Sequence, residues 1–336
     1  MEFTGQHILS VDQFDRAAIE QIFDTADAME PFAARERRTT VLEGAILSNM
    51  FFEPSTRTRI SFGSAFNLLG GQVRETSEVK ASSLTKGESL HDTARVLSGY
   101  SDVIVMRHPA AGAVQEFAEA SRVPVINGGD GPNEHPSQAL LDLYTIRKEL
   151  RSQGKPMNGL RIALVGDLKY GRAVHSLCKL LSVFEKVNYR LVSPPELAAP
   201  GNIVSRLRSA GHSDEEFAEF EEGINHCDIL YVTRTQEERF PSQTEADRYR
   251  GLFQLNAAVY TANCEPNTVI MHPLPRDSRS QAQELSVDLN ENPNLAIFRQ
   301  TDNGVLVRMA LFALVLNVAH HVEDYATSVP WHSRRG

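Results

Sequence analysis

Residues 45–69 read AILSNMFFEPSTRTRISFGSAFNLL, which is an apolar run, a polar turn and an amphipathic stretch in that order. The run 45–53 predicts a buried strand, which Pro54 ends because a proline favours extended geometry in the residue before it. Apolar side chains of the segment 56–69 recur at the spacing of one helix face. They are Phe62, Ala65, Phe66 and Leu69. The stretch therefore predicts a strand that leads directly into a helix.

The same alternation of apolar runs and amphipathic stretches continues outward along the chain. Further strands are expected at 102–108, 124–128, 161–166, 187–192, 228–233 and 269–271. Helices are expected at 112–121, 136–150, 171–184 and 303–318. Strand followed by helix, repeated, is typical of an α/β protein in which helices cover both faces of a parallel sheet.

The chain has 336 residues, a length that corresponds to about two domains. The polar stretch 151–158, which contains Gly154 and Pro156, is expected to link them. We therefore expect two domains of similar size, each a mostly parallel sheet flanked by helices. One is residues 1–150, completed by the C-terminal helix 303–318, and the other is residues 151–302. The tail 319–336 loses periodicity, and the sequence predicts no role for it.

Composition excludes several classes of protein. The chain is 41% hydrophobic and 23% charged, as in ordinary globular proteins. Its net charge of −9 argues against nucleic-acid binding, although a local cluster of arginines can still hold a small anion. The most apolar stretch, 309–319, is too short to span a bilayer, and residues 1–10 show no secretory signal. The cysteines, Cys178, Cys227 and Cys264, are widely spaced, so neither a disulfide framework nor a zinc site is expected, and a cytoplasmic location fits best.

The turn 55–58 is the first candidate binding site. Ser55 is a suitable N-cap, and the first helical turn adds the hydroxyls of Thr56 and Thr58 and the guanidinium of Arg57. A helix N-terminus carries partial positive charge and free N–H groups, so this turn predicts a phosphate site. The alternative is a plain capped helix with solvated arginines.

Further candidates lie in the same half of the chain. The segment 81–89 is either a surface loop or an arm that brings Lys86 to an anion. Arg107 ends a strand, where ligands of parallel sheets collect. The glycine-rich segment 127–138 places His135 at the N-cap before Pro136, with Gln138 in the same helical turn.

The second half offers two arginines and a proline-rich turn. The segment 165–172 lacks the GxGxxG fingerprint of dinucleotide-binding proteins, and Arg172 begins a helix there. Arg234 ends another strand, and two arginines suit a substrate with two carboxylates. The two prolines of HPLPR, 272–276, end the hydrogen bonding of the preceding strand and leave bare carbonyl groups that could bind a ligand. The alternative is a rigid turn without a ligand.

Together these motifs resemble the aspartate/ornithine carbamoyltransferase family, over residues 10–318. They are STRT at 55–58, RHP at 107–109, HPSQ at 135–138, DLKYGR at 167–172, RTQ at 234–236 and HPLPR at 272–276. The HPLPR motif resembles the form found in the aspartate-using branch of the family, because ornithine-using relatives usually have Cys where Pro273 stands. The resemblance implies that carbamoyl phosphate and L-aspartate give N-carbamoyl-L-aspartate and phosphate, an early step of pyrimidine synthesis.

The resemblance also implies a role for each matched residue. The phosphate ligands would be Ser55, Thr56, Arg57 and Thr58. The groups that polarise the carbamoyl carbonyl would be Thr58, Arg107 and His135, which with Arg57 form the catalytic set. The carbamoyl NH2 would be held by Gln138 and by the carbonyls of Leu274 and Pro275, across a cis peptide bond. L-Aspartate would be bound by Lys86, Arg172, Arg234 and Gln236.

The family further implies an active site in the interdomain cleft, between a carbamoyl-phosphate-binding domain and an aspartate-binding domain. It implies a homotrimer with shared sites, in which Lys86 arrives from a neighbouring subunit with either Ser82 or Ser83. A separate regulatory chain can accompany such trimers. No metal and no cofactor is expected, because the amine attacks the carbonyl directly.

Alternative functions remain open at this point. Transfer to ornithine or a modified ornithine is disfavoured by Arg234, which would repel a cationic side chain. A catalytically silent scaffold subunit should have lost its charged site residues, which are all present. A dehydrogenase is disfavoured by the missing glycine fingerprint.

Overall fold

The computed structural model describes residues 1–76, 87–279 and 282–331. The chain divides into two compact units. Unit 1 comprises Met1–Leu141 and Asp302–Gly336, and unit 2 comprises Asp142–Thr301. The divide therefore falls inside two helices, α6 (Pro136–Ser152) and α12 (Ile297–Val315).

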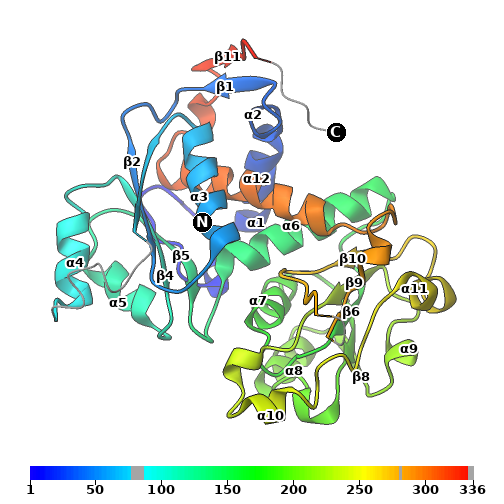
Figure 1. The fold of residues 1–336 in the computed structure, drawn as a ribbon. Helices are drawn as coiled ribbons and strands as arrows, with labels where there is room; N and C mark the ends of the chain where they lie inside the picture. The colour runs from blue at the N-terminus through cyan, green and yellow to red at the C-terminus, as the bar shows by residue number, and fades with distance from the viewer. Residues whose placement is uncertain (77–86, 280–281, 332–336) are drawn as a thin grey trace. The chain divides into compact units, whose positions relative to one another are not determined.

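Unit 1 is built on a parallel sheet with the strand order β3-β2-β4-β5. Figure 1 labels β2, β4 and β5 of this sheet. The strands are β2 (Ile46–Phe51), β3 (Gln72–Thr76), β4 (Val103–His108) and β5 (Val125–Asp130). The helices of unit 1 besides α6 and α12 are α1 (Arg16–Ala28), α2 (Glu30–Ala33), α3 (Thr56–Leu68), α4 (Leu90–Leu97) and α5 (Ala113–Ala120), with short 3-10 turns at Val11–Gln13 and Ala319–His321.

Helix α3 packs through the face that the sequence predicts. Its apolar positions Phe62, Ala65 and Phe66, and the C-cap Leu69, are fully buried. Phe312, from the part of α12 that belongs to unit 1, meets Phe62 and Phe66 edge-on, with ring centroids 5.9 and 5.0 Å apart. The C-terminal helix thus completes the core that begins at residue 45.

Unit 2 carries a second parallel sheet, with the strand order β10-β9-β6-β7-β8. Its strands are β6 (Arg161–Val165), β7 (Asn188–Val192), β8 (Ser213–Phe217), β9 (Ile229–Val232) and β10 (Val269–Met271). Its helices are α7 (Arg172–Leu181), α8 (Gly201–Ser209), α9 (Phe220–Gly223), α10 (Gln243–Ala246) and α11 (Ala257–Asn263), with 3-10 turns at Pro195–Leu197, Glu237–Arg239 and Val287–Leu289. Two parallel sheets flanked by helices confirm the predicted α/β class.

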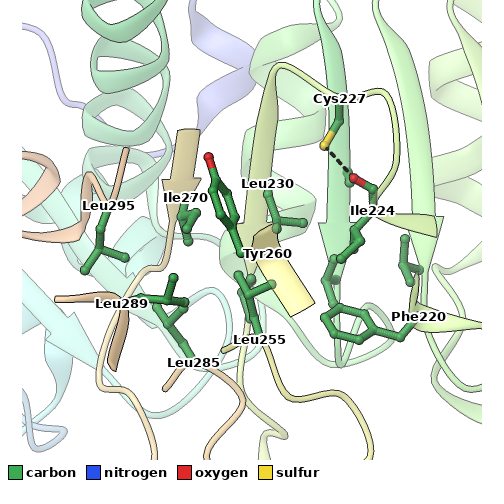
Figure 2. Packing of buried hydrophobic residues seen from close by; sticks show 14 of the residues in the cluster. Phe220, Ile224, Cys227, Leu230, Leu255, Tyr260, Ile270, Leu285, Leu289 and Leu295 are labelled. Carbon is green, nitrogen blue, oxygen red and sulfur yellow. Dashed lines mark hydrogen bonds between the residues drawn. The ribbon is translucent and has the colours of Figure 1, made fainter. Parts of the chain in front are cut away.

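The core of unit 2 joins its strands to the loops that follow them. Figure 2 shows Leu230 of β9 and Ile270 of β10 beside Leu255, which precedes α11, and beside Leu285 and Leu289, which follow β10. Leu255 and Leu285 also form an isolated parallel bridge. These loops are therefore fixed by burial of apolar side chains and by backbone hydrogen bonds.

The structure differs from the sequence prediction near the end of the chain. The last helix begins at Ile297 and not at residue 303, because Ile297 and Gln300 are buried although the segment 297–302 lacks an apolar run. The expected linker 151–158 starts inside α6, which ends at Ser152. The tail forms strand β11 (Ala326–Ser328), which pairs antiparallel with β1 (Arg37–Thr39) (Figure 1). Among the described helices, none is both long and apolar enough to cross a membrane.

Candidate active site

The N-terminus of α3 presents the predicted phosphate turn. Ser55 occupies the N-cap position, with φ −162° and ψ 90°, but its hydroxyl makes no capping hydrogen bond. Thr56 and Arg57 are exposed, whereas Thr58 is buried. The position of the N-cap was predicted correctly. The side-chain hydrogen bond that an N-cap serine usually accepts is absent here. The hydroxyl of Ser55 is thus not committed to the helix end.

Arg59, on the same turn, has a structural partner. Its Nη1 donates to Oε2 of Glu75 at 3.0 Å, and its carbonyl accepts a hydrogen bond from Nδ2 of Asn49 at 3.0 Å. Arg59 therefore ties α3 to β2 and β3. Arg57, two residues earlier, is exposed at the second position of the helix.

Arg107 is the next-to-last residue of β4, and two acceptors hold its guanidinium. Its Nε donates to Oε2 of Glu53 at 2.9 Å, and its Nη1 donates to the carbonyl of Gly128 at 3.3 Å. The residue is 9% exposed. Glu53 follows β2, the strand that neighbours β4, so the carboxylate orients the guanidinium across the sheet edge.

His135 stands at the N-cap of α6, as predicted. The backbone N–H groups of Gln138 and Ala139 donate to its carbonyl at 3.0 and 3.1 Å. The imidazole is 6% exposed, and its Nδ1 lies 3.5 Å from Oγ of Ser137. The loop before it turns at Gly131, where a Cβ would stand 2.3 Å from the carbonyl of Pro109. Only glycine fits this close approach of two loops.

One buried carboxylate organises that loop. Asp130 is 2% exposed, and its oxygens accept hydrogen bonds from four groups. They are Nδ2 of Asn127 (3.2 Å), the backbone N–H of Glu134 (3.1 Å), the backbone N–H of Gly112 (3.1 Å) and Nδ2 of Asn133 (3.0 Å). Asp130 thereby joins the loop after β4 to the loop after β5.

The carboxyl ends of three neighbouring strands thus carry the predicted residues of unit 1. The turn 55–58 follows β2, Arg107 is next to the last residue of β4, and His135 follows β5. In the ladder Phe51 is opposite Arg107, and His108 is opposite Asp130. Because the carboxyl ends of parallel strands meet at one edge, the fold brings these three segments together as one set.

In unit 2, Asp167 organises the ends of β6 and β9. This residue is 1% exposed, and its two oxygens accept the backbone N–H groups of Tyr170 and Gln236, each at 2.9 Å. Burial raises the pKa of Asp167, and the two N–H donors only partly oppose that effect. Gln236 is thereby fixed beside the loop that leads to Arg172, the first residue of α7.

Arg234 follows β9 and is paired with an acidic residue of its own loop. Its Nη1 and Nη2 donate to the two oxygens of Glu238 at 3.0 and 2.7 Å, and Nη1 also donates to the carbonyl of Thr235 at 2.9 Å. Burial opposes the charge of Arg234, but Glu238 outweighs it and raises the pKa of the guanidinium. Within the described residues these contacts take three of its five N–H donors. Gln236 donates through Nε2 to the Arg234 carbonyl at 3.1 Å.

The ends of β6 and β9 line a small open pocket. Its walls include Asp167, Thr233, Arg234, Thr235 and Glu284. Arg234 therefore borders this pocket, whereas Arg172 and Gln236 are not among the residues that line it.

The turn after β10 confirms one detail implied by the family resemblance. The Leu274–Pro275 peptide bond is cis. The backbone N–H of Leu274 donates to Nδ1 of His272 at 2.8 Å. Arg276 donates through Nη1 to Oδ1 of Asn290 at 3.0 Å. The turn is thus held by side chains on both sides of the two prolines.

Three predicted site residues, Ser82, Ser83 and Lys86, lie outside the described residues. No group of three or more His, Cys, Asp and Glu side chains suited to a metal ion occurs in the described ranges.

Sequence reasoning missed the carboxylates that orient the predicted residues. They are Glu53, Asp130, Asp167 and Glu238. Glu53 and Asp167 come two residues after a strand and Asp130 is the last residue of β5, so their position at a strand end was the available signal. Glu238 gave none, since its partner is defined only by the folded loop.

Comparisons with known proteins agree with this arrangement. Residues 6–148 match the family model described as aspartate/ornithine carbamoyltransferase, carbamoyl-P binding domain. Residues 158–315 match the model described as aspartate/ornithine carbamoyltransferase, Asp/Orn binding domain. An aspartate carbamoyltransferase catalytic subunit from Cellvibrio japonicus is 71% identical over 99% of this chain and 98% of that protein.

Solved structures are similar over nearly the whole chain. Aspartate transcarbamoylase from Trypanosoma cruzi, in complex with carbamoyl phosphate and aspartate, has a TM-score of 0.85 and 38% identity, covering 94% of this chain and 98% of that one. The same enzyme in complex with N-(phosphonacetyl)-L-aspartic acid also has a TM-score of 0.85 and 38% identity, covering 94% and 97%. The chain therefore belongs to the aspartate/ornithine carbamoyltransferase family and, within it, to the aspartate carbamoyltransferase catalytic subunits.

Proposed function

We propose that this chain transfers the carbamoyl group of carbamoyl phosphate to the amine of L-aspartate, giving N-carbamoyl-L-aspartate and phosphate for pyrimidine synthesis. The observation that supports the proposal is the set of segments at the ends of β2, β4 and β5, in which Arg107 and His135 are both buried. The Cellvibrio japonicus relative and the liganded Trypanosoma cruzi structures support it.

Unit 1 would bind carbamoyl phosphate. The phosphate would lie at the α3 N-terminus on Ser55, Thr56, Arg57 and Thr58, where free N–H groups and the helix dipole favour an anion. The carbonyl oxygen would face Thr58, Arg107 and His135. As the amine attacks, negative charge grows on that oxygen, and one prearranged donor is commonly worth about 3 kcal/mol.

Unit 2 would supply the second substrate site. Arg172, Arg234 and Gln236 would bind L-aspartate, and the carbonyls of Leu274 and Pro275, with Gln138, would hold the carbamoyl NH2. Bringing the two reactants together is worth on the order of 7 to 11 kcal/mol. The departing phosphate can accept the proton of the amine, so the reaction balances without a cofactor.

The assembly is also part of the proposal. A homotrimer would share its sites. A neighbouring subunit would supply Lys86 as a ligand of L-aspartate, together with Ser82 or Ser83, one of which would contact the phosphate. A regulatory chain would bind such a trimer, in keeping with the name catalytic subunit of the relatives. The domains would be residues 1–150 with 303–318, for carbamoyl phosphate, and residues 151–302, for aspartate. The three free cysteines suit a cytoplasmic location.

An amine-specificity assay tests the reaction. The full chain is incubated with carbamoyl phosphate and either L-aspartate or L-ornithine, and products are identified by mass spectrometry. We expect N-carbamoyl-L-aspartate and an equal amount of phosphate with L-aspartate alone. Carbamoylated ornithine, or no product from either amine, would contradict the proposal. Calorimetry with N-(phosphonacetyl)-L-aspartic acid checks that one site binds both substrate moieties.

Mixing experiments test the shared site. Lys86→Ala and Arg57→Ala proteins are each expected to be inactive, since each lacks one essential cation. After joint dissociation and reassembly, some mixed trimers would contain a site with both cations intact. Recovery of activity in the mixture alone supports shared sites, and its absence in verified mixed trimers argues against them.

A further inference from the structure

The turn after β10 is held at both ends by one pair of buried side chains, His272 and Glu284. We infer that this pair acts as a positioning device that fixes the turn Leu274–Asp277 and, through it, the carbonyl groups of Leu274 and Pro275. The inference rests on the proposed function, which assigns those carbonyls to the carbamoyl NH2. Neither side chain is itself assigned to a substrate.

The hydrogen bonds of His272 define which nitrogen carries the proton. The backbone N–H of Leu274 donates to Nδ1 at 2.8 Å, so Nδ1 must be unprotonated. Nε2 lies 2.8 Å from Oε1 of Glu284 and therefore carries the hydrogen that it donates. His272 is 1% exposed, and its burial lowers the pKa of the imidazole in spite of Glu284. The ring is thus a neutral bridge between a backbone donor and a carboxylate.

Glu284 holds the other end of the same turn. The backbone N–H of Asp277 donates to its Oε1 at 3.1 Å and lies 3.3 Å from its Oε2. Oε1 therefore receives both His272 and Asp277. Hydrogen bonds to one dyad thus fix the first and last backbone N–H groups of the segment that contains the two carbonyls.

The turn requires such support because Leu274 has an unfavourable backbone. Its φ is +59°, in the left-handed region that side chains other than glycine seldom adopt. Residues held in this region persist only where the surroundings fix them. The hydrogen bond from the Leu274 N–H to His272 acts on the residue that would otherwise relax.

The pair is anchored in the interior of unit 2. Leu285, next to Glu284, is 1% exposed and packs in the core with Leu255, as Figure 2 shows. The backbone N–H of His272 donates to Oε1 of Gln300 at 3.0 Å. Gln300 in turn donates to Asp142 at 2.6 Å. The turn is therefore attached to the core of unit 2 by packing, and to the helices α12 and α6 by hydrogen bonds.

Two substitutions of one residue separate the functions of the ring. In His272→Asn the amide oxygen can take the place of Nδ1 and accept from Leu274, but it cannot reach Glu284. In His272→Gln the longer amide can take the place of Nε2 and contact Glu284, but it leaves the Leu274 N–H without an acceptor. Both variants remove the same buried ring.

We expect His272→Asn to keep kcat within about tenfold of the wild type and His272→Gln to lose about 100-fold, the effect of misplacing a substrate contact by about 1 Å. The KM for L-aspartate should stay within about twofold in both. Equal losses of kcat in the two variants, or the smaller loss in His272→Gln, would overturn the inference, because a purely structural ring would affect both alike.

A second readout does not depend on activity. Amide hydrogen exchange at Leu274 should be slow in the wild type and in His272→Asn and at least tenfold faster in His272→Gln. Equal exchange in the two variants overturns the positioning pair. If the exchange rates differ as expected while the wild type forms no carbamoyl aspartate, the pair stands and the proposed function fails.

Two further variants complete the set. Glu284→Leu should lower kcat, because it removes the oxygen that accepts from both Nε2 of His272 and the backbone N–H of Asp277. His212→Asn is the matched control, since His212 is also buried and also accepts a backbone N–H through Nδ1, from Val187 at 3.2 Å. It should leave kcat unchanged. A loss in His212→Asn equal to that in His272→Gln would assign the effect to unit stability and overturn the inference.

Discussion

The carboxylate of Asp130 accepts a hydrogen bond from the backbone N–H of Gly112 at 3.1 Å. This bond joins the loop that follows Arg107 to the loop that leads to His135. Arg107 and His135, which are proposed to polarise one carbonyl oxygen, thus border loops that Asp130 joins, although the loops follow separate strands. Their spacing depends on a residue with no proposed contact to the substrate.

Asp130→Asn tests this dependence. The amide keeps the shape of the carboxylate but turns one acceptor into a donor that faces the donors already bound there. We expect kcat to fall by about 10- to 100-fold while the protein remains folded. Steady-state kinetics and thermal unfolding measure the two effects. Asn133→Ala is the control, since it removes one exposed donor to Asp130 and should change kcat by less than about threefold.

Arg57→Ala should abolish formation of N-carbamoyl-L-aspartate while the fold survives, because Arg57 is exposed on the first turn of α3. The product assay and circular dichroism check the two parts. Turnover like that of the wild type would refute the phosphate role of this turn.

Arg59→Ala is the matched control for Arg57. It deletes an arginine from the same turn, but one that is bound to Glu75 at 3.0 Å. This partly exposed ion pair is worth up to about 1 kcal/mol. We therefore expect a small loss of stability in urea titration and retained activity. A loss of activity equal to that of Arg57→Ala would show that the effect is not specific to Arg57.

Arg234→Lys should weaken L-aspartate binding selectively. A lysine keeps the charge but cannot form the paired hydrogen bonds that a guanidinium makes with carboxylates. We expect the KM for L-aspartate to rise at least about tenfold, which corresponds to roughly 1.4 kcal/mol. The KM for carbamoyl phosphate should change by less than about twofold. A rise in the KM for carbamoyl phosphate without a rise in the KM for L-aspartate would contradict the proposal that Arg234 binds L-aspartate.

Asp228 is expected to make the stability of unit 2 sensitive to acid. Its side chain is 8% exposed and contacts Lys155 at 2.7 Å and Arg161 at 2.8 Å. Burial alone would raise the pKa of Asp228, but these donors outweigh burial and lower it below 3.8. Its contribution is therefore fully present above about pH 4 and is lost as the pH falls through the folded pKa.

Asp228→Asn should destabilise the protein by about 2 kcal/mol at pH 7, since both cations are partly exposed. The difference from the wild type should shrink below pH 4 in urea titrations. Glu323→Gln, which breaks the exposed pair with Arg37, is the control and should cost at most about 1 kcal/mol. A constant difference for Asp228→Asn down to pH 2.5 would show that charge is not the cause.

Sequence patterns predicted the elements that bury apolar side chains. The helix face of Phe62 and Phe66 was predicted correctly because its periodicity reflects burial on one side. The strand Val269–Met271 was predicted correctly because all its residues are apolar and buried. The edge strands β3 (QVRET) and β8 (SDEEF) were missed, since their alternating residues are mostly exposed and carry no apolar run. Strand β11 was missed because its partner β1 is nearly the whole chain away.

In the candidate site, too, the sequence predicted some residues and missed others. Motif residues such as Arg107 and His135 were predicted because they stand beside glycines, prolines and strand ends in the sequence. Their orienting partners were not, because a contact such as that between Asp167 and Gln236 spans 69 positions. No local pattern encodes such a pair, which exists only once both strand ends have reached the same sheet edge.

The order of the two units along the chain has a consequence for synthesis on the ribosome. Unit 2 is one continuous segment, Asp142–Thr301, whereas unit 1 needs Phe312 and its neighbours from the last helix. During translation the inserted segment can therefore finish folding first, while the nascent amino-terminal part waits with an unfilled core. Stop codons or ribosome stalling upstream of residue 302 should leave that part exposed to proteases, even though most of its own strands have already emerged.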